Sequence, residues 1–171
     1  MEPTKMGELI VPMDERVPER TERVEGIGGW LLLPAIGICL APLRNLAAAF
    51  ENFRPVMDYP QLITPSNPAF NARLTALLGI ETLGNVTLVA LGIWLAWSFF
   101  TKSKHFPKRF AIVGAFALAF HLADIGLVKL WFPGIPIPES TWKDIAQNLI
   151  AVAIWVPYFF KSERAKNTFV R

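Results

Sequence analysis

Apolar and polar residues alternate along the chain in long blocks, and four of the apolar blocks have the length of a membrane-spanning helix. These blocks cover residues of about 28–50, 74–100, 109–132 and 144–160. A helix rises about 1.5 Å per residue, so roughly 20 apolar residues cross the hydrocarbon core of a bilayer. The pattern predicts an all-α, polytopic membrane protein with four transmembrane helices in an antiparallel bundle.

The polar blocks divide the chain into a membrane domain and two tails. Residues 1–25 mix acids, bases and three prolines, which predicts a polar N-terminal tail. Residues 26–161 form the expected four-helix membrane domain, and residues 162–171 form a basic C-terminal tail. The segment 51–73 is rich in proline and asparagine, which is typical of a loop. The first span is therefore expected to end near residue 50.

The composition agrees with a membrane protein, and the positive net charge is then best explained by lipid head groups. Of the 171 residues, 53% are hydrophobic and 18% are charged, which is more apolar sequence than a soluble domain of this size can bury. The formal net charge of +3 comes from cations that flank the apolar spans. Their expected partner is the anionic head groups of a lipid bilayer, and no nucleic acid partner is expected.

The distribution of cations predicts the topology. Arginines precede the first span, a basic segment at residues 102–109 joins the second span to the third, and residues 161–171 are basic. The two other loops contain few lysines or arginines. Cytoplasmic loops carry an excess of these residues, so both termini are predicted to be cytoplasmic.

Several aromatic and basic side chains lie where the spans are expected to meet the lipid head groups. Tryptophan favours this depth, and long cationic side chains can extend to it from within the membrane. The candidate interface anchors are Trp30, Arg44, Lys129, Lys161, Arg164 and Lys166.

Ionisable and amide side chains also lie inside the expected spans. Each ionisable group placed there costs about 2.5 kcal/mol or more unless it is paired, hydrated or neutralised. In the predicted topology Glu81 lies roughly 10 Å and Asp124 roughly 12 Å from the outer end of its span, so the two carboxyls can be level. The predicted intramembrane polar layer consists of Glu81, Asn85, His121, Asp124 and Asn148, with Arg44 or Lys129 as further candidates.

Two interpretations of this polar layer remain open. In the structural one, the side chains hold the bundle together, each amide contributing about 0.6 kcal/mol. In the functional one, they line a hydrated path for a proton, an ion or a small solute. Four helices make a narrow bundle, which favours the structural interpretation.

The sequence contains no catalytic motif that we can identify. It has no Gly-x-Ser-x-Gly elbow and no P-loop, and its one cysteine, Cys39, excludes an intrachain disulfide or a Cys-based metal motif. His121 is the only histidine in the expected spans, so one chain cannot supply a haem-bridging pair. We expect no enzyme activity, no cofactor and no metal site.

Two stretches carry a family resemblance. The first span opens with Gly26-Ile-Gly-Gly-Trp-Leu, followed by Pro34, and the last span closes with IWVPYFFKSERAKNTFV at residues 154–170. Together they resemble the YdgK-like family of bacterial inner-membrane proteins, a domain of unknown function. The resemblance covers nearly everything from Gly26 onward. It implies four helices in the bacterial cytoplasmic membrane and no particular activity.

These observations predict a non-enzymatic membrane accessory or interaction protein. Ala115, Ala119 and Ala123 recur every fourth residue in the third span, a ridge that lets another helix approach closely. The expected partner is a second copy or another membrane protein. The alternative function is a component of a transport path for a small solute, a proton or an ion, using the acids and the histidine of the polar layer.

Overall fold

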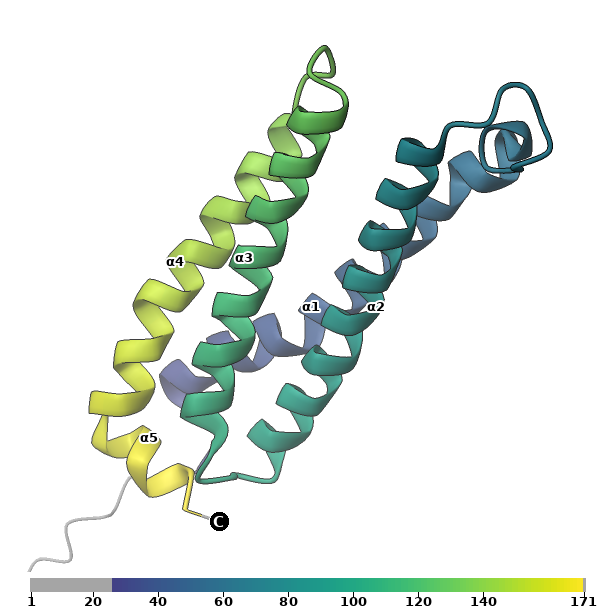
Figure 1. Ribbon diagram of the computed structural model, residues 1–171. Helices are drawn as coiled ribbons and strands as arrows, with labels where there is room; N and C mark the ends of the chain where they lie inside the picture. Colours follow the sequence, from purple (N-terminus) through teal and green to yellow (C-terminus); the bar gives the residue numbers. More distant parts are fainter. Residues whose placement is uncertain (1–25, 171) are drawn as a thin grey trace, which may run out of the picture.

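The structure, a computed structural model, describes residues 26–170, and within this range all regular secondary structure is helical (Figure 1). The predicted tail at residues 1–25 lies outside the described residues. The long helices are α1 (Leu32–Asp58), α2 (Ala72–Phe100), α3 (Phe106–Trp131) and α4 (Glu139–Lys161). The short ones are η1 (Gly29–Leu31), η2 (Pro60–Leu62) and α5 (Glu163–Thr168).

Three helical segments in the described part are long and apolar enough to cross a membrane. They are Gly29–Asp58, Ala72–Phe100 and Phe106–Trp131. Helix α4 has 23 residues but is not among them. Its first turns carry charged and amide side chains, including Asp144, Gln147 and Asn148, which lower its hydropathy.

The end of α1 differs from the prediction. The sequence predicted a loop from residue 51, whereas the helix continues to Asp58. Pro55 lies inside the helix, although a proline there lacks the N–H group for one hydrogen bond and crowds the carbonyl four residues earlier. The helix stops at Tyr59, because Tyr59 precedes Pro60 and a residue before proline disfavours the helical conformation. Arg44 consequently lies in the middle of α1 instead of near its end.

The other long helices begin at recognisable signals. The side chain of Asn71 caps α2 by accepting a hydrogen bond from the N–H of Leu74 at 3.1 Å. Helix α3 has Pro107 in its first turn, where the missing N–H has no helical partner to lose. Helix α4 starts directly after Pro138, five residues before the predicted residue 144.

The long helices form two pairs. Helix α1 packs on α2, α3 packs on α4, and the contact between α2 and α3 joins the pairs. Figure 1 shows the pairs close together at the end that carries α5 and spread apart toward the two loops at the other end. Where α2 meets α3, a Cβ atom added to Gly84 would lie 1.9 Å from the ring of Phe120. Only glycine therefore permits this approach.

The core lies at the end that carries α5 and consists largely of phenylalanine rings. Phe106 contacts Phe99 at 5.1 Å, Phe159 at 5.0 Å and Phe169 at 4.6 Å between ring centroids. The four side chains come from α2, α3, α4 and the segment after α5, and all are buried. Aromatic contacts of this kind contribute about 0.5–1.5 kcal/mol each beyond the area that they bury. We call these four side chains the aromatic cluster.

The C-terminal segment, predicted as a basic tail, is part of the fold through Val170. Helix α5 begins where the Ser162 hydroxyl accepts a hydrogen bond from the N–H of Ala165. Ala165 and Phe169 are four residues apart, so they share the face that packs on the core. The Thr168 hydroxyl accepts a hydrogen bond from the N–H of Gly26 at 3.2 Å and donates one to the carbonyl of Arg164 at 2.8 Å. The two ends of the described chain are thus joined.

Candidate functional site

Two cavities of similar size lie between the helix pairs, one above the other along the helix axes. The first has a volume of about 460 Å³ and is nearer to α5; we call it the Arg44 chamber. The second has a volume of about 500 Å³ and is nearer to the loops; we call it the acidic chamber. His121 lines both chambers.

The acidic chamber collects carboxylates from all four long helices. Glu51, Glu81, Asp124 and Asp144 line it, and none of the described residues in its wall is a lysine or an arginine. The Oδ1 atom of Asp124 is buried and has no hydrogen-bond partner among the described residues. Several carboxylates in a partly dehydrated space require a proton, water or a cation between them. The chamber is therefore suited to a positively charged or hydrogen-bond-donating occupant.

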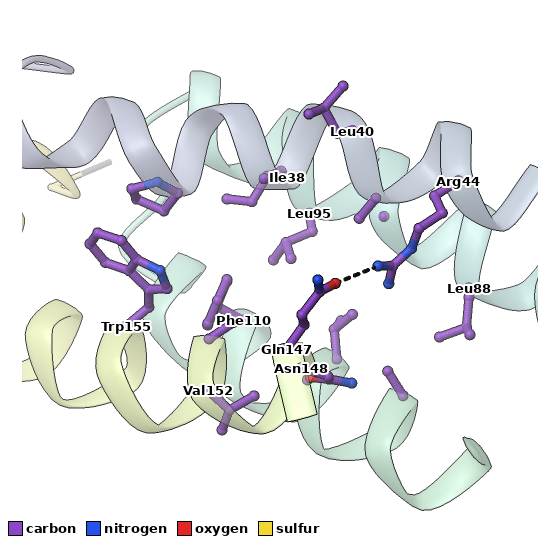
Figure 2. A pocket seen from close by; sticks show the side chains of 18 of the residues that line it. Ile38, Leu40, Arg44, Leu88, Leu95, Phe110, Gln147, Asn148, Val152 and Trp155 are labelled. Atoms are coloured by element: carbon purple, nitrogen blue, oxygen red, sulfur yellow. Dashed lines mark hydrogen bonds between the residues drawn. The ribbon is translucent and has the colours of Figure 1, made fainter. Parts of the chain in front are cut away.

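The Arg44 chamber has the opposite character. Its wall is mainly apolar, and Arg44 is the only charged side chain among the described residues that line it. Figure 2 shows Trp155 toward one side of this chamber and Arg44, Gln147 and Asn148 toward the other. The amides of Asn45, Gln147 and Asn148 add hydrogen-bonding groups to the wall of this chamber.

A polar bridge between α1 and α4 lies where the two chambers meet. The Arg44 Nη1 atom donates to Asp144 Oδ1 at 3.1 Å and to Gln147 Oε1 at 3.3 Å. Asp144 belongs to the wall of the acidic chamber and Gln147 to that of the Arg44 chamber. The side chains of Arg44 and Asp144 are 52% and 40% exposed, so the bridge is not enclosed by the helices.

The structure brings together most of the predicted polar layer. Glu81, Asn85, His121 and Asp124 all line the acidic chamber. Asn148 lines only the Arg44 chamber, which it shares with His121. Lys129 is in neither wall, and its Nζ atom donates to the carbonyl of Ile135 at 3.1 Å.

The predicted interface anchors have different surroundings. Trp30, Lys161 and Lys166 are exposed. Arg164 instead packs against the glycines at the start of η1, where a Cβ atom on Gly29 would lie 2.8 Å from its Nη1 atom. Gly29 also has φ of 54°, a conformation that favours glycine. This contact explains why glycines precede the first helix.

Sequence reasoning missed Glu51, Asp144 and Gln147 as lining residues. The sequence predicts a loop at Glu51 and the first residue of a span at Asp144. The sequence contains one weak indication that Asp144 and Gln147 bind the same partner, Arg44. The two positions are three residues apart and therefore share a helix face. Among residues 26–170, no group of three or more His, Cys, Asp or Glu side chains is arranged to hold a metal ion.

Comparisons with known proteins cover nearly the whole described chain. The family described as "Protein of unknown function (DUF2569)" matches residues 24–170. The inner membrane protein YdgK of Escherichia coli (strain K12) is 28% identical over 152 residues, which are 88% of this chain and 97% of that protein. No solved structure matches. The matched region contains both chambers and every described helix.

Proposed function

The chain belongs to the DUF2569 family of proteins of unknown function, and from this premise we propose that it is a four-span inner-membrane protein with both termini in the cytoplasm. Three of its helical segments have the length and composition of membrane spans. Helix α4 packs along α3, and its 23 residues extend about 35 Å. The polar side chains Thr141 and Asp144 line the acidic chamber, which relieves α4 of exposing them to lipid.

The proposed topology can be tested with single cysteines. In a Cys39→Ser background, Ser66→Cys lies in the loop before α2 and Ser103→Cys lies in the basic turn before α3. A membrane-impermeant maleimide added to intact cells is expected to label residue 66 and to label residue 103 only after permeabilisation. The reverse pattern would overturn the orientation, and labelling of both positions from one side would show that α2 does not cross the membrane.

Within this topology the protein acts as a non-enzymatic interaction protein. The observation that carries this proposal is the placement of Ala115, Ala119 and Ala123, which are all exposed on one face of α3. In a bilayer, a ridge of small side chains lets a second helix approach closely enough for extensive van der Waals contact. The ridge therefore fits a helix of a second copy or of another membrane protein.

The alanine ridge is tested by adding bulk to it. Donor- and acceptor-labelled copies of the full chain, labelled at Ser66→Cys in the Cys39→Ser background, are mixed in lipid vesicles and energy transfer is measured against protein density. Ala119→Leu is expected to lower the transfer several-fold. Ala153→Leu, the same change at an exposed alanine of α4, is the control. Equal transfer in the parent and both variants would contradict self-association through this ridge.

A transport path is the second candidate function, and the acidic chamber favours it. Glu81, Asn85, His121 and Asp124 all line one cavity of about 500 Å³. Vesicles containing the protein are expected to show cation or proton flux that Asp124→Asn abolishes. Glu139→Gln, an acid outside the chamber wall, should leave the flux unchanged. Absence of flux above that of empty vesicles would contradict this candidate.

A further inference from the structure

The Arg44 chamber has the shape and chemistry of a binding site that neither proposed function requires. Helices α1 and α4 form its sides, and α2 and α3 contribute residues such as Leu95 and Val113. Its volume of about 460 Å³ falls in the range of roughly 300–1,000 Å³ that is typical of small-molecule sites. Apolar walls with a few convergent polar groups are the usual composition of such sites.

The chamber is accessible from the side. Leu33 and Leu40 line it and are 53% and 57% exposed, so its wall is open along α1. Helix α1 packs chiefly on α2, whereas its link to α4 is the polar bridge at Arg44. In a membrane this side opening faces the lipid acyl chains. An occupant can therefore enter from the bilayer with its hydrocarbon part between α1 and α4.

The charge of the wall selects the head group. Arg44 is the only charged residue among the described ones in the wall, and the carboxylates gather in the other chamber. A guanidinium has five N–H donors, and the bonds to Asp144 and Gln147 both use the Nη1 atom. Donors on Nη2 and Nε remain for an anion. Charge-assisted hydrogen bonds to an anion are about twice as strong as neutral ones.

We propose that the Arg44 chamber binds a single-chain anionic amphiphile, such as a long-chain carboxylate, with its chain along the apolar wall toward Trp155 and its head group at Arg44. Asn148 and Gln147 provide amide N–H groups beside that position (Figure 2). A partner helix does not explain a cation placed at one end of an apolar cavity. A cationic ligand would be repelled by Arg44 and attracted to the acidic chamber.

Photolabelling of the full chain tests the proposal. The protein is placed in phosphatidylcholine vesicles with a diazirine analogue of palmitate, irradiated, and digested for mass spectrometry. Cross-links are expected on chamber residues such as Leu33, Val113 and Val152. Palmitate should compete at least about tenfold better than its methyl ester, because the ester lacks the charge that a guanidinium bonds most strongly. Equal competition by the two compounds, or cross-links spread over the exposed faces of all helices, would overturn the proposal.

Matched variants locate the head group and the chain. Arg44→Gln should reduce labelling about tenfold, whereas Arg44→Lys should retain most of it. Ala151→Trp fills the chamber and should abolish labelling, while Ala153→Trp places the same bulk on the exposed face of α4 and should not. Full labelling of Ala151→Trp would show that the amphiphile binds elsewhere. If Arg44→Gln does not fold, the comparison of palmitate with its ester on the parent protein decides the question.

Discussion

The two chambers are built from the same four helices and have similar volumes, about 460 and 500 Å³, yet their charges are opposite. The Arg44 chamber has one cation and no carboxylate among its described lining residues. The acidic chamber has four carboxylates and no lysine or arginine. The difference arises over only a few helical turns, because each helix contributes different side chains at different heights. The charge of a cavity in a small membrane protein therefore depends on the few side chains at that height and not on the composition of the whole helices.

The two chambers stay distinct because the two helix pairs contact each other at some heights and lie apart at others. The aromatic cluster ties α2, α3 and α4 together at the end that carries α5, Ala35 and Ile38 of α1 belong to the same buried core, and Gly84 lets α2 and α3 approach midway. Beyond that level the pairs spread apart, which leaves room for the acidic chamber (Figure 1). Three changes, taken from the largest expected effect to the smallest, disturb this arrangement at different heights.

Gly84→Val should have the largest effect, because it forces the two helix pairs apart. A Cβ atom at this position would overlap the Phe120 ring, and overpacking of this kind costs about 1–3 kcal/mol or more. The melting temperature of the detergent-solubilised protein is expected to fall by several degrees. Gly79→Val is the control, since nothing lies within 4 Å of a Cβ atom there. Similar melting temperatures for the two variants would show that α2 and α3 are not in close contact.

Thr168→Val should have an intermediate effect, because it removes the hydrogen bond between the Thr168 hydroxyl and the N-terminal segment. The loss of the hydrogen bond from Gly26 is expected to cost about 1 kcal/mol. The variant should be cleaved faster by a protease after α4, while the melting temperature changes little. Thr87→Val tests the specificity, since that hydroxyl bonds only to Leu83 of its own helix. Faster cleavage of both variants would point to a general loss of stability.

The sequence predicts the broad arrangement well and the bridge between the chambers poorly. Hydropathy locates Glu81, His121 and Asp124 on neighbouring helices, and their depths follow from the helical rise, so a shared polar layer could be foreseen, whereas the cavity that these side chains line could not. The end of α1 could not, because Pro55 and Pro60 look alike in sequence while only the second one stops the helix. That error placed Arg44 at an interface.

The docking of α5 was missed for a related reason. Ala165 and Phe169 are two apolar residues among cations, and such a short stretch indicates a solvated tail as readily as a packed helix. Their burial depends on the aromatic cluster, which unites residues from 99 to 169. Contacts between residues so distant in the chain leave no local pattern.

The bridge between Arg44 and Asp144 should give the smallest change in stability. Both side chains are about half exposed, so a double-mutant cycle of Arg44→Gln and Asp144→Asn is expected to give a coupling energy of about 0.5–1 kcal/mol. The coupling should weaken at high salt, since exposed charges are screened. A coupling of several kcal/mol that is insensitive to salt would contradict this, because it would place the pair in a dry interior.

The bridge contributes little to stability, but we expect it to control access from one chamber to the other. Its atoms lie between the carboxylates of one chamber and the apolar wall of the other, so removing it should change access more than stability. In a Cys39→Ser background, Ala117→Cys reports on the Arg44 chamber. An impermeant anionic thiol reagent applied from the side of the acidic chamber should label residue 117 faster once Asp144→Asn is added. This follows because the change removes both one repelling charge and the partner of Arg44. Unchanged labelling would show that the charge of one chamber has no effect on entry into the other.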